Sequence, residues 1–120
     1  MWYSDLVDPN EIAASFTTQV RKGVLTYCIL TICSKGSVYS SDLLEKLKTH
    51  ELIVSEGTIY PLLNRLKSDG LLEYEWQESP NGPPRKYYRI SDEGKTYLKV
   101  ISSEWKKITN NINSLEKNKG

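Results

Sequence analysis

Hydrogen-bonding and cationic side chains share one side of a helix that the sequence predicts over residues 56–69. Apolar side chains recur every three or four residues in this segment and form the opposite, core-facing arc. Between Glu56 and Asp69 the outward arc carries two cations and no carboxylate. Such groups can reach the base edges and phosphates of a nucleic acid. The candidates on this arc are Thr58, Tyr60, Asn64, Arg65 and Lys67.

A second pair of cations, Arg85 and Lys86, follows the segment SPNGPP, which has the composition of a turn or loop. Alternating residues on either side of this segment predict a β-hairpin over residues 72–90 with a long tip. Cations beside such a tip can bind the phosphates that flank a groove. Three glutamates of the first strand oppose this charge, so binding to DNA would weaken strongly with added salt. The alternative for both segments is a solvated surface whose tyrosines pack on the core.

The elements that precede these two segments must position them. Asp8 as a cap and Pro9 at the first helical position predict a helix that runs, with or without a break at Gly23, to about Gly36. Ser41 is predicted to cap a second, shorter helix. The link from that helix to the third is brief, so the two must cross as a helix-turn-helix.

Pro61 interrupts the pattern of the third helix, which Ser55 is expected to cap and Gly70 to end. Proline usually breaks a helix interior, because it lacks an N–H and its ring clashes with the carbonyl four residues before it. Here that residue is Gly57, and both lie on the outward arc, where water or a bound duplex can replace the hydrogen bond that the proline removes. We expect one continuous, slightly bent helix over residues 56–69.

A long final helix is predicted over residues 92–117, with Ser91 as its cap. It would extend about 39 Å at the rise of an α-helix. The preceding elements are too small to cover an apolar seam of that length, and a second copy of the same helix would cover the rest. Seam residues are expected to form a dimer interface or an effector site; they are Leu98, Ile101, Trp105, Ile108, Ile112 and Leu115.

The composition bounds the class of protein. The chain has 120 residues, a net charge of +1, 38% hydrophobic and 26% charged residues, which suits one soluble domain without a global field for nucleic acid. No secretory signal or membrane span is evident, and Cys28 and Cys33 are expected to be unpaired core residues of a cytoplasmic protein. His50 is the single histidine, so no catalytic set, metal site or cofactor site is expected.

The motifs SEGTIYPLLNRLKSDGLLEYEW and GPPRKYYRISDEG together resemble the PadR-like transcriptional regulators. The resemblance implies a mainly α fold with a small β-hairpin, a winged helix-turn-helix with a long C-terminal dimerisation helix. It divides the chain into a DNA-binding domain at residues 1–90, with a helical extension at 1–20, and a dimerisation helix at 91–120. It also implies a homodimeric repressor that binds a palindromic operator, with helix 56–69 in the major groove and wing 72–90 beside it.

Carried over by position, the five outward residues of the third helix and the two wing cations resemble the DNA contacts of this family. One departure lies at the start of the second helix, where the family often has Gly-Tyr-Glu and this chain has Ser40, Ser41 and Asp42. The hydroxyl groups of Ser40 and Ser41 and the helix N-terminus can still bind a phosphate.

Two further alternatives concern partners. Some compact members of the family resemble multidrug sensors, in which a tryptophan of the last helix lines an apolar pore between subunits, and Trp105 occupies such a position. Packing of Trp105 within the dimer is the simpler interpretation. Because the net charge is near neutral, the second alternative is a winged-helix module that binds another protein and not DNA.

Overall fold

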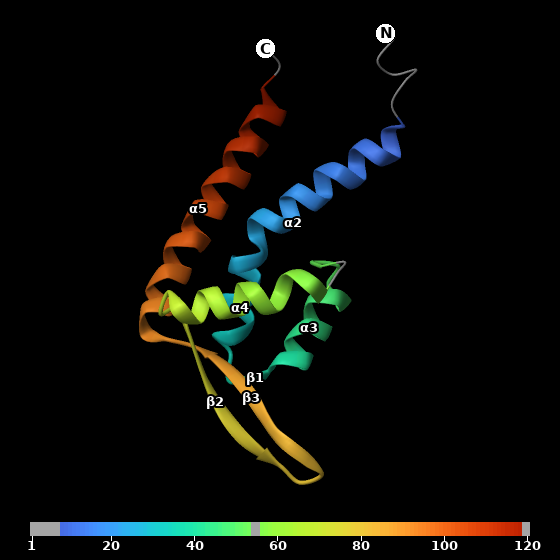
Figure 1. Ribbon diagram of the computed structural model, residues 1–120. Coiled ribbons are helices and arrows are strands. Elements are labelled where there is room, and N and C mark those ends of the chain that lie inside the picture. The colour runs from blue at the N-terminus through green and yellow to red at the C-terminus, as the bar shows by residue number, and fades with distance from the viewer. Residues whose placement is uncertain (1–7, 54–55, 119–120) are drawn as a thin grey trace.

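The computed structural model describes residues 8–53 and 56–118, and it is mainly helical with one small antiparallel sheet (Figure 1). Three helices form the core, and a two-stranded hairpin extends from it as a wing. Two long helices leave the core on the side opposite the wing (Figure 1). The predicted winged helix-turn-helix with a long C-terminal helix is therefore confirmed.

The first described helix, α2 (Pro9–Cys33), begins as its sequence predicts. The Asp8 side chain caps it by accepting a hydrogen bond from the backbone N–H of Asn10 at 2.9 Å, and Pro9 takes the first helical position. The helix runs through Gly23 as one element and ends at Cys33, three residues before the predicted end. Only its C-terminal half reaches the core. Residues 1–7 of the predicted N-terminal extension lie outside the described part.

The second helix, α3 (Ser40–Thr49), begins two residues earlier than a cap at Ser41 predicts. Its N-cap is Tyr39, with no side-chain capping bond, and Ser41 lies inside the first turn, so the prediction of Ser41 as the cap was wrong. The reason is a short strand, β1 (Val38–Tyr39), which pairs with the wing and keeps the backbone extended up to Tyr39. The helix then buries three leucines in the core.

Pro61 lies in the first turn of the third helix, whereas the sequence pattern predicted it in the helix interior. A 3₁₀ turn, η1 (Glu56–Thr58), leads directly into α4 (Ile59–Ser68), so the winding is continuous but begins as a tighter helix. Pro61 is then the third α-helical residue, and its missing N–H is one that a helix start leaves without a partner. Gly70, with a φ of 80°, ends the segment as predicted, while Ser55 lies outside the described residues.

The wing consists of β2 (Leu72–Ser79) and β3 (Gly82–Ile90), and the order of the sheet is β1-β3-β2. The turn comprises residues 80 and 81 alone, so the prediction of a long loop tip was wrong. Pro83 and Pro84 lie inside β3, next to an irregularity in the register. Prolines fit there because β1 reaches only the far end of β3 and leaves this stretch with a single partner strand.

Alternation along the two strands gives the wing two different faces. The inner face, toward the core, carries Leu72, Tyr74 and Trp76 of β2 opposite Ile90, Tyr88 and Lys86 of β3. The outer face carries Glu73, Glu75 and Gln77 opposite Arg89, Tyr87 and Arg85.

The final helix, α5 (Asp92–Lys117), has the bounds and the Ser91 cap that the sequence predicts. The Ser91 hydroxyl accepts a hydrogen bond from the Gly94 N–H at 2.9 Å and donates one to the Gly70 carbonyl at 2.5 Å. A Cβ at Gly94 would lie 2.1 Å from the Leu71 carbonyl oxygen and 2.6 Å from Cγ1 of Ile90. The first turn of α5 is thus seated directly on the base of the wing.

Replacing Ser91 by alanine should lower the free energy of unfolding by about 1–2 kcal/mol, because the helix cap and the bond to Gly70 are lost together. Urea denaturation followed by circular dichroism would measure the change. Ser103→Ala is the matched control, since Ser103 is an exposed residue inside the same helix. Equal stability of Ser91→Ala and the wild type would contradict the capping role.

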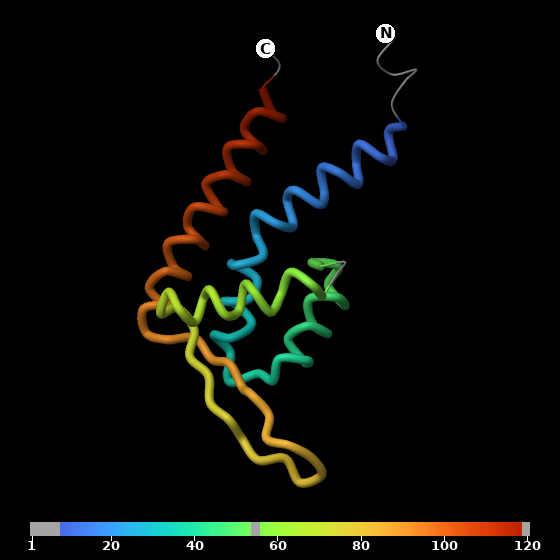
Figure 2. The backbone as a smooth tube through the Cα atoms, in the orientation of Figure 1, coloured from blue at the N-terminus to red at the C-terminus, as the bar shows by residue number. Residues whose placement is uncertain are grey.

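The apolar seam of α5 is covered only near its start. Leu98 and Ile101 pack against the core and Trp105 is half-buried, whereas Ile108 is 49% exposed. In Figure 2 the far half of α5 and the first half of α2 separate as two arms. Both arms expose large apolar side chains: Ile12, Phe16 and Val20 on α2, and Ile108, Ile112 and Leu115 on α5.

The two cysteines are free thiols on α2, as predicted. Burial raises the pKa of Cys33 to about 12 and raises that of Cys28 to a lesser degree, so both remain protonated at neutral pH. Within residues 8–53 and 56–118, none of the helices combines the length and hydropathy that crossing a bilayer requires.

Candidate nucleic-acid interface

The outward face of α4 is polar, and the opposite face of the same helix is apolar and packs on the core. Ile59, Leu63 and Leu66 are buried in the core, which fixes the rotation of the helix about its axis. That rotation places every predicted contact residue of this segment on the surface, including Tyr60 at 46% exposure. The exposed set is Thr58 of η1 and Tyr60, Asn64, Arg65 and Lys67 of α4.

The two cations of this face have different surroundings. Arg65 lies 3.9 Å from the Asp69 carboxylate, but both side chains are more than half exposed, so the pair holds Arg65 only weakly. The ammonium group of Lys67 lies over the ring of Tyr74 in β2, 4.9 Å from its centroid. Lys67 therefore links α4 to the wing.

On the outer face of the wing, Arg89 pairs with two carboxylates. Its guanidinium lies 3.1 Å from the Glu73 carboxylate and 3.4 Å from that of Glu75. The hydrogen bond to Glu73, together with the charge on Glu75, raises the pKa of Arg89 above its ordinary value. Glu73 and Glu75 thus offset one of the three wing cations, Arg89, and neither forms an ion pair with Arg85 or Lys86.

Arg85 and Lys86 point to opposite faces of the wing, as consecutive strand residues must. Lys86 lies on the inner face, 4.0 Å from the ring centroid of Tyr74 and 5.7 Å from that of Trp76. Arg85 lies on the outer face, 4.9 Å from the ring centroid of Tyr39. Neither cation forms an ion pair with any carboxylate that the structure describes.

Tyr39, Tyr74 and Trp76 position these cations, and the sequence interpretation did not identify them. Alternation already placed Tyr74 and Trp76 on one strand face. A two-residue turn at residues 80 and 81 would by itself have set Trp76 opposite Arg85. The irregularity between Gln77 and Ser79 shifts the register by one residue, and Trp76 lies opposite Lys86. The position of Tyr39 had no comparable local signal, since it depends on pairing between β1 and β3.

The start of α3 lies beside the wing, because Tyr39 pairs with Tyr87 of β3. Ser40 is half-buried and Ser41 is exposed in the first turn of the helix. The N–H groups of that turn have no intrahelical acceptor, so this end of α3 is suited to an anion.

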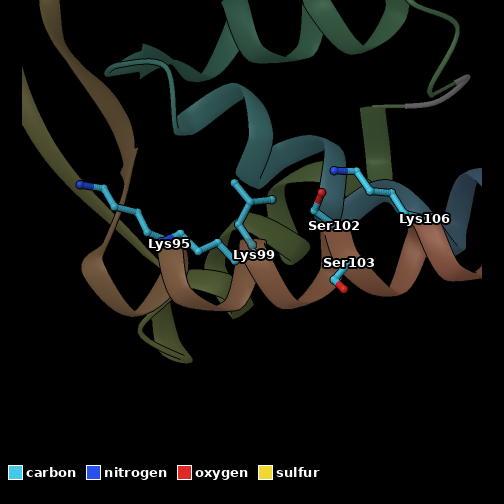
Figure 3. Close-up of a pocket in the computed structure, with 6 residues that line it drawn as sticks. Lys95, Lys99, Ser102, Ser103 and Lys106 are labelled. Carbon is cyan, nitrogen blue, oxygen red and sulfur yellow. The ribbon is translucent and has the colours of Figure 1, made fainter.

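A second basic surface lies along α5, and the residues that line it all belong to that helix. Figure 3 shows Lys95, Lys99 and Lys106 along one side of the helix, with Ser102 and Ser103 between them. They border an open cavity of about 590 Å³, and Trp105 is not among its lining residues. Lys95 is also 3.7 Å from the Asp92 carboxylate, so its charge is partly offset.

Comparison with known proteins gives consistent results. A PadR-like transcription factor from Bacteroides fragilis is 48% identical, covers 84% of this chain and 98% of its own, and has a TM-score of 0.70. A PadR family regulator from Eggerthella lenta is 31% identical over 91% of this chain and 96% of its own, with a TM-score of 0.81.

Among curated proteins, the transcriptional regulator Rv3488 of Mycobacterium tuberculosis is 39% identical over 80 residues, 67% of this chain and 74% of that protein. The named relatives are regulators of transcription and not enzymes. Residues 29–100, from the end of α2 into α5, match the family described as Transcriptional regulator PadR-like. This protein belongs to that family of DNA-binding regulators.

Proposed function

We propose that this protein is a homodimeric repressor that binds a palindromic operator through α4 and the wing. The observation that carries the proposal is the distribution of charge around α4. Lys67, Arg85 and Lys86 have no carboxylate partner among the described residues, while Glu73 and Glu75 are occupied on the outer face of the wing. A surface that combines free cations with exposed hydrogen-bonding groups suits a polyanion with readable edges.

The contact residues divide into two roles in this proposal. Tyr60 and Asn64 lie one turn apart on exposed α4 and read base edges in the major groove, with Thr58 and Arg65 beside them. The remaining contacts go to phosphates and orient the protein on the duplex. These are Lys67, Arg85, Lys86, and Ser40 and Ser41 at the start of α3.

The homodimer in this proposal forms through the two arms. The exposed apolar residues of α2 and of the far half of α5 need a cover, and a second copy supplies the same surfaces in a closed two-fold arrangement. Trp105, half-buried at the middle of the seam, then faces the partner, where it either packs the dimer or stacks on a planar apolar effector. Residues 1–90 act as the DNA-binding domain and residues 91–120 as the dimerisation helix of a cytoplasmic regulator.

Binding to random-sequence duplex DNA tests the proposal without knowledge of the operator. If three cations of each protomer neutralise one phosphate each, a plot of log affinity against log salt concentration should have a slope of roughly −5. Fluorescence anisotropy with a labelled duplex measures that slope. Absence of binding even at low salt would refute the repressor and favour a winged-helix module that binds another protein. If the duplex is bound, selection of bound fragments from a random DNA pool tests for a two-fold symmetric site.

A further inference from the structure

Two cations from different elements lie over a single aromatic ring between α4 and the wing. The Lys67 ammonium, from α4, is 4.9 Å from the ring centroid of Tyr74, and the Lys86 ammonium, from β3, is 4.0 Å from the same centroid. Both distances are within the range of a cation–π interaction. Tyr74 therefore links α4 to β3 of the wing, because one lysine of each contacts its ring.

The ring of Tyr74 is held in place by its neighbours. Its centroid lies 5.9 Å from that of Tyr88, which is only 3% exposed and belongs to the core. On the other side Trp76 meets it edge-on, at 6.5 Å and an interplanar angle of 89°. Tyr74 itself is half-buried, so one part of the ring is fixed while the cations occupy the rest.

The cluster holds two positive charges without a negative one. Two ammonium groups held close to one ring repel each other, and the ring quadrupole offsets only part of that repulsion. Neither Lys67 nor Lys86 has an ion pair in residues 8–53 and 56–118, and Glu73 and Glu75 pair with Arg89. Glu73, Asp92 and Glu93 border the same open hollow as Lys67, but none of them pairs with it. An anion that contacts both ammonium groups would offset this repulsion.

We propose that Tyr74 is a positioning residue that holds Lys67 and Lys86 as one phosphate site between α4 and the wing. The site takes a DNA backbone phosphate at the boundary between the major groove read by α4 and the groove flanked by the wing. Tyr74 does not touch the nucleic acid; it acts by fixing the two ammonium groups. The inference rests on the proposed DNA binding and adds to it a residue outside the recognition helix and the wing tip.

A series of variants at position 74 separates this role from simple packing. Phenylalanine keeps both the shape and the quadrupole of the ring, trifluorophenylalanine keeps the shape but weakens the quadrupole, and leucine removes the ring. The expected order of affinity for a random-sequence duplex is Tyr74→Phe equal to wild type, trifluorophenylalanine weaker, and Tyr74→Leu weakest, by about tenfold. The salt slope should become shallower by about one unit per protomer in Tyr74→Leu.

Two controls make the result specific. Tyr97→Leu removes an exposed tyrosine of α5 that carries no cation among the described contacts, and it should leave both affinity and slope unchanged. In a background of Lys67→Met and Lys86→Met, Tyr74→Leu should have no further effect, because the groups that it positions are gone. Circular dichroism confirms that each variant is folded, and the fluorinated variant decides the question if leucine disrupts the wing.

The outcomes distinguish this inference from the function on which it rests. A wild-type protein that binds no duplex at low salt overturns the proposed function. A wild type that binds, together with a trifluorophenylalanine variant of unchanged affinity and slope, overturns the role of Tyr74 alone. Additive effects of Tyr74→Leu and the two methionine substitutions would equally contradict it, since they would show that the ring acts independently of the lysines.

Discussion

Replacing Arg65 and Lys86 together by alanine should weaken DNA binding by more than about a hundredfold and leave the dimer intact. Arg65 is on the exposed face of α4 and Lys86 on the inner face of the wing. The double substitution therefore removes one cation from each of the two elements that we propose to contact the duplex. In a dimer four cations are lost. The Arg65 side chain is 78% exposed and its pair with Asp69 is weak, so the fold should tolerate the change.

The matched control removes the same charge from another surface. Lys99→Ala with Lys106→Ala deletes two exposed cations of α5, beside the open cavity. Anisotropy titrations at one fixed salt concentration compare the two double variants. An equal loss in both would show that net charge alone governs binding, and wild-type affinity in the Arg65 and Lys86 variant would refute the assigned contacts.

Ile108→Glu is expected to convert the dimer into monomers at micromolar concentration. Ile108 lies at the middle of the α5 seam and is 49% exposed in the isolated chain, so the substitution costs the protomer little. In a two-fold interface, however, two carboxylates would be buried near each other without a cation. Sedimentation equilibrium measures the change, and operator affinity should fall with it because the two half-sites are no longer linked.

Asn110→Glu supplies the same charge on an exposed position of α5 away from the seam and should remain dimeric. Helical content by circular dichroism should be equal in the two variants. A dimer that survives Ile108→Glu would place the interface elsewhere, for example on the α2 arm alone. The exposed apolar residues of α5 would then have no role in dimerisation.

The elements that the sequence predicted well are those defined by local signals. Asp8 followed by Pro9 specifies the start of α2, and Ser91 followed by two acidic residues specifies the start of α5. Both signals act within one helical turn, where side chain and backbone meet regardless of the rest of the chain. Gly70 ends α4 for the same kind of reason, because its positive φ suits a residue without a Cβ.

The errors arose where distant pairing overrode local preference. Ser41 is a good cap by composition, but the pairing of β1 with β3 moved the helix start to Ser40. Two prolines suggested a loop, yet β3 accommodates them where it has one neighbouring strand. Pro61 was predicted in the interior of the helix because no residue type in the sequence marks the 3₁₀ turn that precedes α4.

The candidate site was predictable in its residues and not in its contacts. Helical periodicity alone identified the exposed side of α4, because the buried leucines determine what remains outside. The support of Arg85 by Tyr39 and of Lys67 by Tyr74 joins residues from separate elements. Such contacts follow from the packing of β1 and α4 against the wing, which no spacing within one segment encodes.

The close contact of Gly94 with Leu71 fixes the start of the long C-terminal helix on the base of the wing. There is no room for even a methyl group between Gly94 and the backbone of Leu71, so we expect the first turn of the helix and the base of the wing to move together. From Gly94 to the end of α5 is about 35 Å, so each degree of rotation about Gly94 moves the end of the helix by roughly 0.6 Å. In a dimer joined through the far half of α5, as proposed, the angle between this helix and the wing would therefore set the spacing of the two DNA-binding surfaces along the duplex.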